Sequence, residues 1–153
     1  SLAKFATVIN VNLRGVFNVM AKCAEQMARN EPDENGERGV IVNVSSGAAF
    51  EGQIGQSAYS GSKAGVNGMN IPAARELGPL GIRVNSIAPG LFGTPLVKGL
   101  DQKVQDSLIA MCEAPKRMGE VDEFAHACAF LAENGYMNGR VLRLDAATVM
   151  QAR

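Results

Sequence analysis

The chain has 153 residues, 46% of them hydrophobic, and its 15 lysines and arginines balance 15 aspartates and glutamates. This length suits a single domain. The balanced charge offers no basic surface for nucleic acid, and no apolar run approaches the ~18 residues that a membrane span needs. We therefore expect neither nucleic acid nor a membrane as a partner.

The first predicted element is a helix over residues 4–29, followed by a polar turn over residues 31–38. Apolar residues recur along this helix at helical spacing and predict its core face: Phe5, Val8, Ile9, Val16, Phe17, Met20 and Met27. Asn12 lies on the same stripe, where a buried amide needs hydrogen-bond partners.

A β-branched run over residues 40–44 predicts a strand buried on both faces, as in a parallel sheet. The glycine- and alanine-rich loop over residues 47–58 is long for a compact domain, which favours a functional role. A helix is expected from Tyr59 to Leu77, and a second strand from Ile82 to Ala88, closed by Pro89-Gly90.

The remaining chain predicts a short amphipathic helix near residues 100–111, a helix over residues 121–133 and a strand over residues 141–144. We expect residues 91–112 to form a lid. Acidic residues in the first turn of the helix over 121–133, and Gly135 just past its end, suit the two ends of a helix. The alternation of helices and strands predicts an α/β fold with crossover helices.

Three cysteines, Cys23, Cys112 and Cys128, are widely spaced and form no C-x-x-C pair. We expect neither a disulfide framework nor a metal site. A reducing compartment is the simpler interpretation, either the cytoplasm or, in a eukaryote, the mitochondrial matrix. His126, the only histidine, is interpreted as an ordinary helix residue.

The residues that carry chemistry gather at three predicted places. Ser46 ends the first strand, Pro89 ends the second, and Tyr59 begins the helix that joins them. A right-handed crossover brings such places to one edge of a parallel sheet, where open α/β folds bind ligands. Lys63, four residues after Tyr59, shares its helix face.

The motifs VNLRG around Asn12, VNVSS ending at Ser46, YSGSK from Tyr59 to Lys63 and IRVNSIAPGLFGT from Ile82 to Thr94 resemble those of the short-chain dehydrogenase/reductase family. The resemblance implies a Rossmann-like, doubly wound parallel sheet and a catalytic tetrad. Four residues match that tetrad: Asn12, Ser46, Tyr59 and Lys63. It also implies a nicotinamide cofactor beside six residues: Tyr59, Lys63, Pro89, Gly90, Phe92 and Thr94.

A closer resemblance, to type II 3-hydroxyacyl-CoA dehydrogenases, rests on AAFEGQIGQSAYSGSKAG, IAPGLFGTPL and NGRVLRLDAA. It implies an NAD-dependent enzyme, with NADP not excluded, that interconverts a secondary alcohol and a ketone. The substrate would be a small molecule, an acyl thioester or another hydroxy or keto compound. One departure is Asp145-Ala146-Ala147, where the family has Asp-Gly-Gly or Asp-Gly-Ala.

The family begins with a strand, a glycine-rich phosphate turn and a helix, and no such motif precedes Asn12. The glycines that would let a backbone approach the pyrophosphate are missing with it. We therefore expect residues 1–153 to form a single, partial domain, the carboxyl-terminal portion of such an enzyme, with its catalytic activity an open question.

In the mechanism that the resemblance implies, Tyr59 is the acid/base. An ammonium about 4 Å away stabilises a phenolate by on the order of 4 kcal/mol at an effective dielectric of 20, and Lys63 would supply it. Ser46 would hold the substrate oxygen, and Asn12 would anchor a water that relays protons from Lys63. The structural alternatives are a turn residue at Ser46, a satisfied core amide at Asn12 and a solvated lysine at Lys63.

Two other functions stay open. One is an NADPH-dependent 3-oxoacyl-carrier-protein reductase, and the other is a non-catalytic chain that keeps only an oligomer surface. The family resemblance implies a homodimer or homotetramer formed through the helices that carry Asn12 and Tyr59. Gly61, Gly65 and Gly68 lie in a row on the Tyr59 helix, where small side chains permit a close approach.

Overall fold

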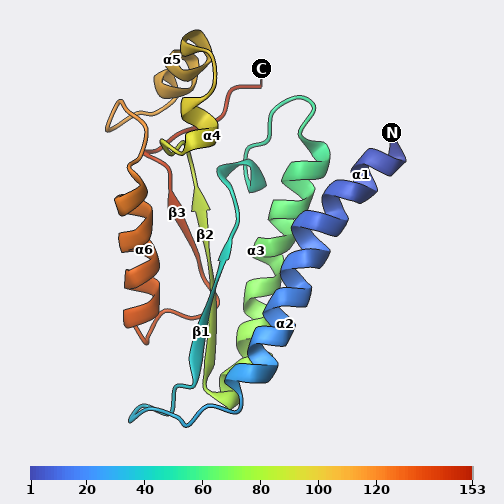
Figure 1. The fold of residues 1–153 in the computed structure, drawn as a ribbon, viewed down its shortest axis with the longest axis vertical. Helices are drawn as coiled ribbons and strands as arrows, with labels where there is room; N and C mark the ends of the chain where they lie inside the picture. Colours follow the sequence, from blue (N-terminus) through green and yellow to red (C-terminus); the bar gives the residue numbers. More distant parts are fainter. Residues whose placement is uncertain (153) are drawn as a thin grey trace.

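The computed structural model describes residues 1–152, which form three layers, with a parallel sheet between two layers of helices (Figure 1). The sheet contains β1 (Gly39–Val44), β2 (Ile82–Pro89) and β3 (Val141–Leu144) in that spatial order. Gly39 lies opposite Ile82, and Ser86 lies opposite Val141. All three predicted strands are therefore confirmed, with ends that differ by at most one residue.

Helices cover both faces of the sheet (Figure 1). On one face lie α1 (Leu2–Ile9), a π-helical segment (Asn10–Arg14), α2 (Gly15–Met27) and α3 (Ser57–Leu77). On the other face lies α6 (Val121–Glu133), with the bounds that the sequence predicts. The short helices α4 (Pro95–Lys98) and α5 (Gln102–Ala110) lie beyond the carboxyl ends of the strands.

Two apolar clusters hold these layers together. The first joins α2 and α3 to the sheet and contains Met20, Ala24, Ile41, Ala73, Ile82 and Val84. The second joins α6 to the sheet and contains Ile87, Ala127 and Leu131. Because β2 supplies residues to both clusters, it is the strand that is buried on both faces.

Four sequence predictions are wrong in detail. Phe5 is 44% and Phe17 53% exposed, so the apolar stripe of the first helix continues past the core onto the surface. Val44 at the end of β1 is 46% exposed, because β1 has a neighbouring strand on one side only. Gly135 does not cap α6, whose cap is Asn134. In addition, the π-helical segment interrupts the predicted continuous helix.

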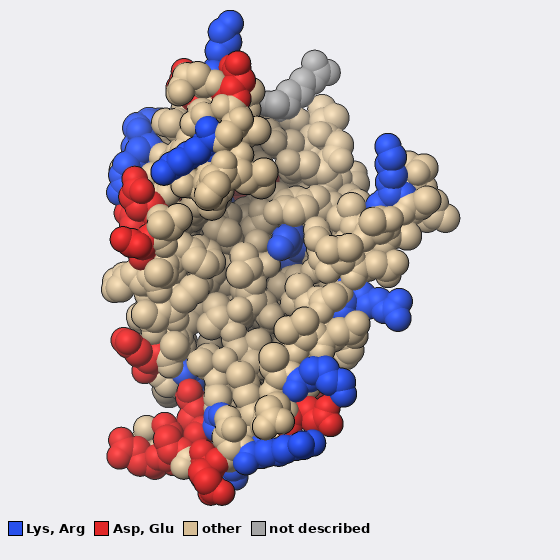
Figure 2. Space-filling model, in the orientation of Figure 1, with Lys and Arg blue, Asp and Glu red and all other residues tan. Residues whose placement is uncertain are grey.

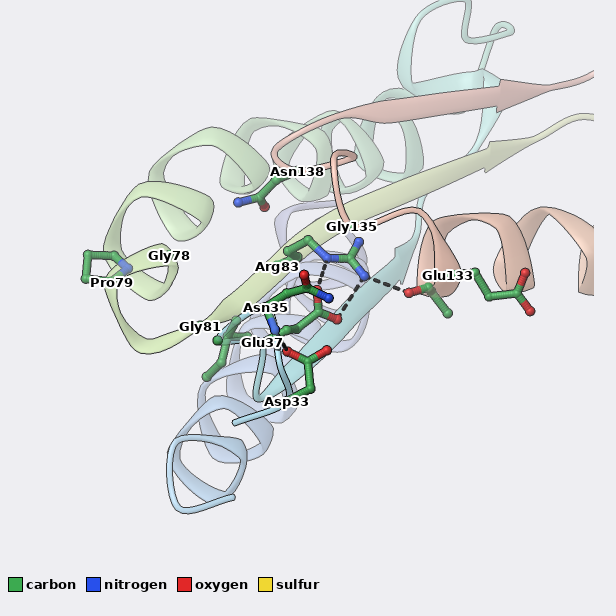
Figure 3. A pocket seen from close by; sticks show the side chains of 13 residues that line it. Asp33, Asn35, Glu37, Gly78, Pro79, Gly81, Arg83, Glu133, Gly135 and Asn138 are labelled. Atoms are coloured by element: carbon green, nitrogen blue, oxygen red, sulfur yellow. Dashed lines mark hydrogen bonds and ion pairs between the residues drawn. The ribbon is translucent and has the colours of Figure 1, made fainter. Parts of the chain in front are cut away.

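Arg83 of β2 closes the carboxyl end of α6 instead (Figure 3). Its Nη1 donates to the carbonyl oxygens of Leu131, at 2.7 Å, and Met137, at 3.0 Å. Its Nη2 donates to the carbonyl of Ala132 at 2.7 Å and to Glu37 Oε1 at 2.9 Å, and its Nε donates to the other Glu37 oxygen. The side chain is 8% exposed, so this buried cation is paired and also satisfies the orphan carbonyls of the helix end.

A cavity of about 590 Å³ lies beside Arg83, between the turn before β1 and the end of α6 (Figure 3). All five N–H groups of a guanidinium are donors, and each of those on Arg83 already has an acceptor. Asp33 and Glu133 also line this cavity. Acidic side chains gather over the same end of the molecule in Figure 2. Arg83 therefore serves the fold and has no donor left for a ligand.

The turn after β3 has an unusual backbone. Ala146 and Ala147 have φ angles of 51° and 54°, in the left-handed region that costs a residue with a Cβ about 1–2 kcal/mol. These are the positions at which the sequence departs from the glycines of the family pattern. The turn is held in place because the Ala146 carbonyl accepts the amide of Glu113 at 2.9 Å.

No helix within residues 1–152 is both long and apolar enough to cross a membrane.

Substitution of Arg83 by methionine should lower the free energy of unfolding by about 3–5 kcal/mol, because it leaves the Glu37 carboxylate and the carbonyls of Leu131 and Ala132 without their donor. Denaturant unfolding measures the change. Arg75→Met, on an exposed position of α3, is the control and should change stability by no more than about 0.5 kcal/mol. Equal effects of the two substitutions would contradict the role assigned to Arg83.

Ala146→Gly should stabilise the chain by about 1 kcal/mol, because relief of the left-handed strain exceeds the entropy that glycine adds to the unfolded state. The midpoint of thermal unfolding should rise by about 2–4 °C. Ala64→Gly, at an exposed helical position of α3, should have the opposite effect and destabilise by about 1 kcal/mol. A loss of stability in both variants would show that the Ala146 turn is not strained.

Candidate active site

Tyr59 and Lys63 lie one turn apart near the start of α3 and share a face of that helix. Lys63 Nζ lies 5.8 Å from the centre of the Tyr59 ring. Tyr59 is 38% exposed, so part of its side chain remains accessible to a ligand. The geometry brings this predicted pair together.

Lys63 also connects α3 to the end of β1. Its Nζ donates to the carbonyl oxygen of Val44 at 3.0 Å. Partial burial lowers the pKa of Lys63 below its ordinary value of 10.5, because desolvation disfavours the charged form. An ammonium has three N–H donors, and Val44 accepts one of them.

Ser45, to which the sequence pattern assigns no role of its own, adds a second hydrogen bond between the same two elements, with the donor on the strand side. Its Oγ donates to the carbonyl of Lys63 at 3.1 Å, and its amide donates to the carbonyl of Ile87 at 2.7 Å. Ser45 is 2% exposed. The role of Ser45 has no sequence signal beyond the adjacent pair of serines. Its contact with Lys63 depends on how α3 packs against β1.

Ser46 caps the short 3-10 helix at Gly47–Ala49, and its Oγ accepts the amide of Ala48 at 3.1 Å. The turn-residue role weighed for it is therefore present. The hydroxyl can still donate its own hydrogen. Ser46, Pro89 and Gly90 together line a cavity of about 110 Å³, which places the ends of β1 and β2 at one site, as the crossover argument predicts.

Asn12 lies in the π-helical segment and connects to α3 through Ser62. Asn12 Nδ2 donates to Ser62 Oγ at 3.3 Å, and that hydroxyl donates to the carbonyl of Tyr59 at 2.6 Å. Ser62 is fully buried and was not predicted. Asn12 thus contacts α3 through Ser62. Within residues 1–152 no hydrogen bond joins the side chains of Asn12, Ser46, Tyr59 and Lys63 to one another.

A second cavity, of about 330 Å³, opens beside the ends of β1 and β2. Pro89, Gly90, Phe92 and Thr94, all predicted cofactor-binding residues, form part of its wall. Its other lining side chains are apolar and come from β1, α4 and α6: Val44, Val97, Val121 and Phe124. Phe92 and Phe124 meet edge to face, with ring centres 5.7 Å apart. The cavity therefore offers a mainly apolar wall with Thr94 as a polar group.

Comparisons with known proteins identify relatives of this chain. A family model described as enoyl-(acyl carrier protein) reductase matches residues 1–146. The 3-hydroxyacyl-CoA dehydrogenase type-2 proteins of Bos taurus and Homo sapiens are 54% and 52% identical over 151 residues, which is 99% of this chain and 58% of each relative. The (3R)-3-hydroxyacyl-CoA dehydrogenase of Rattus norvegicus is 40% identical over 145 residues, which is 94% of this chain and 54% of that relative.

A solved structure, the 3-hydroxyacyl-CoA dehydrogenase type-2 from Mycobacterium avium, is 46% identical with a TM-score of 0.97. It covers 100% of this chain, and this chain covers 59% of it. The chain thus spans 58% of the length of the curated type-2 relatives. These findings confirm the predicted doubly wound fold and the resemblance to part of a longer dehydrogenase.

Lysine titration followed by NMR tests the environment of Lys63. Lys63 should titrate below the ordinary lysine pKa because of its burial, whereas Lys22 should titrate above it because Glu25 accepts its hydrogen bond. The unfolded chain binds the Lys63 proton more tightly between its folded and unfolded pKa values, so this group makes stability rise as pH rises through that window. A Lys63 pKa at or above that of Lys22 would contradict the geometry.

Proposed function

The chain belongs to the short-chain dehydrogenase/reductase family, and on that premise we propose that it carries the catalytic side chains of an NAD-linked oxidoreductase. The reaction interconverts a secondary alcohol and a ketone. The observation that supports this most directly is the position of the Lys63 ammonium, 5.8 Å from the Tyr59 ring centre and hydrogen-bonded to Val44.

Tyr59 acts as the acid/base in this proposal. Its hydroxyl gives a proton to the carbonyl oxygen during reduction and accepts one from the hydroxyl during oxidation. Unit charges 5.8 Å apart, the distance from Lys63 Nζ to the ring centre, attract by about 3 kcal/mol at an effective dielectric of 20. Solvent at the exposed part of Tyr59 reduces this figure. Lys63 therefore favours the phenolate that the oxidation direction requires.

Ser46 orients the substrate oxygen. Its hydroxyl hydrogen is available while its oxygen accepts the Ala48 amide, and an oriented substrate lowers the barrier through proximity. Asn12 holds the start of α3 in register through Ser62. Its second proposed role, anchoring a water that passes protons from Lys63 to solvent, uses the amide oxygen.

NAD is the cofactor that we propose, and when bound it accepts or supplies the hydride. The residues present fit its nicotinamide and ribose portions. Pro89, Gly90, Phe92 and Thr94 line a cavity that suits a flat ring, and Lys63 has donors beyond the one that Val44 accepts. Within residues 1–152 no glycine-rich phosphate turn is present, so the fit concerns only this end of the dinucleotide.

A 3-hydroxyacyl thioester is the proposed substrate. The names of the type-2 relatives support this choice, and so does the apolar character of residues 91–112, which we propose as the lid. The lid includes Leu100 and Val104, whose side chains are 41% and 46% exposed, as expected for a surface that closes on an acyl chain. The proposed domain is a single partial unit over residues 1–153.

A second candidate has support from the description of the matching family model, which names the acyl carrier protein. In that case the enzyme is an NADPH-dependent 3-oxoacyl-carrier-protein reductase. Calorimetric titration of NADH and NADPH separates the two proposals, since each predicts tighter binding of a different dinucleotide. Binding of neither would support the non-catalytic alternative, in which the chain keeps only its oligomer surface.

We propose a homodimer or homotetramer that pairs through α1, α2 and α3. Val11 and Val19 are 66% and 64% exposed on this face. Gly61 and Gly68 have open space where a Cβ would lie, whereas Gly65 faces Leu13 of the same chain. Apolar exposed side chains beside open glycines suit the close approach of a second copy.

A reducing compartment, the cytoplasm or the mitochondrial matrix, is the proposed location. It is supported by Cys23, Cys112 and Cys128, which are all free thiols.

Tyr59→Phe in the full protein should lower kcat by about 100-fold or more, because acid/base catalysis contributes about 10²–10⁴. Steady-state oxidation of a 3-hydroxyacyl-CoA measures the loss, and circular dichroism checks that the fold is intact. Tyr136→Phe is the matched control, because Tyr136 is the other of the two tyrosines and is fully exposed. Full turnover by the Tyr59→Phe variant would overturn the proposed mechanism.

A further inference from the structure

Arg143, the third residue of β3, joins two segments that are far apart in the sequence. Its Nη1 donates to Glu51 Oε1 at 2.8 Å, in the loop that follows Ser46. Its Nε donates to Asp145 Oδ2 at 2.7 Å, in the turn after β3. The guanidinium carbon also lies 5.0 Å from the centre of the Phe50 ring, which suits a cation–π contact.

The segment after β3 has further contacts with the same loop. Arg143 Nη2 donates to the carbonyl of Thr148 at 3.3 Å, and the amide of Ile54 donates to the carbonyl of Ala152 at 3.0 Å. The pKa of Glu51 is lower than usual, mainly because Arg143 donates to it, with a smaller contribution from the backbone of Met150. Arg143 and Glu51 thus lie at the centre of the contact between the loop, residues 50–54, and the segment after β3, residues 145–152, which we call the tail.

The same turn anchors one end of the proposed lid. Thr148 Oγ1 lies 3.5 Å from Cys112 Sγ, and the Glu113 amide donates to the carbonyl of Ala146 at 2.9 Å. The cavity at Ser46 lies between these parts. Its walls come from the loop, from the end of α5 and from the tail, and include Ala48, Leu108, Met111, Thr148 and Met150.

We propose that Arg143 is a positioning residue that sets the width of the cavity beside Ser46, and thereby the acyl chain length that the site accepts. This rests on the proposed function. Within the described residues Arg143 makes no hydrogen bond to Tyr59 or Ser46, so in this proposal it acts through Glu51 and Asp145. The Glu51 side chain is 27% exposed, and its Oε2 is buried.

The ion pair between Arg143 and Glu51 gives the proposal a distinctive consequence. If Arg143 is removed, Glu51 keeps a partly buried carboxylate without its cation, which is costly unless the loop moves into solvent. Removal of the charge on Glu51 should then restore the loop. A residue that merely fills space would give no such rescue.

Hydrogen exchange on this chain tests whether Arg143 holds the loop against the tail. We call this set of contacts the clamp, and its test needs no catalytic activity. Arg143→Met should speed exchange of the amides in residues 50–54 and 148–152 by about tenfold or more, since local opening governs exchange. Glu51→Gln alone should have a smaller effect, and the double variant Arg143→Met/Glu51→Gln should exchange more slowly than Arg143→Met in residues 50–54. Arg143→Lys, which keeps the charge without the planar fork, should lie between wild type and Arg143→Met.

Arg140→Met is the matched control, because Arg140 is exposed on the segment just before β3 and its side chain makes no ion pair within residues 1–152. In Arg140→Met, amide exchange in residues 50–54 and 148–152 should match that of the wild type. Unchanged exchange in Arg143→Met, or a double variant that opens at least as much as Arg143→Met, would overturn the clamp. If Arg143→Met fails to fold, Glu51→Gln and Arg143→Lys decide: local acceleration in residues 50–54 supports the clamp, and wild-type exchange in both overturns it.

Kinetics on the full protein then tests the effect on specificity. Arg143→Met should raise KM for a long-chain 3-hydroxyacyl-CoA by about fivefold while kcat for a short-chain one changes by less than about twofold, because the catalytic groups stay in place. Equal changes for both substrates would overturn the role in specificity. A wild-type protein that oxidises neither substrate would overturn the proposed function, while the exchange result would still decide whether Arg143 clamps the loop.

Discussion

The two hydrogen bonds between Lys63 and the end of β1 are the constraint on which the candidate site depends. Lys63 Nζ donates to the Val44 carbonyl, and Ser45 Oγ donates to the Lys63 carbonyl. Together they attach the second turn of α3 to the strand in both directions. Because Tyr59 lies one turn earlier on the same helix, this attachment also places the proposed acid/base beside the carboxyl ends of β1 and β2.

The cations at the two ends of the sheet, Arg83 and Lys63, have different roles. At the amino end, Arg83 donates all of its N–H groups to Glu37 and to carbonyls at and after the end of α6. Its contribution is therefore to stability. At the carboxyl end, Lys63 has one N–H bound to Val44 and keeps others for a ligand. The larger cavity beside Arg83 is therefore structural, and the proposed chemistry belongs to the smaller cavities near Ser46 and Thr94.

Local patterns in the sequence were enough for the parts of the fold that depend on local rules. The β-branched runs predicted the strands, and the acidic first turn of α6 predicted its start at Val121. The spacing of Tyr59 and Lys63 predicted a shared helix face. The roles of Ser45, Ser62 and Arg83 could not be predicted, because each depends on a partner at least 18 residues away that only the folded chain brings near. The exposure of Phe5 and Phe17 was missed because periodicity locates an apolar stripe but not what covers it.

The central claim is that Lys63 both fixes α3 to the sheet and offers donors to the dinucleotide. Calorimetric titration of NADH into the full protein, its Lys63→Met variant and a Lys22→Met control tests it most directly. We expect Lys63→Met to bind at least about tenfold more weakly, a loss of about 1.4 kcal/mol, while Lys22→Met, altered at an exposed position of α2, binds as the wild type does. A correctly folded Lys63→Met variant that binds NADH with unchanged affinity would contradict the account.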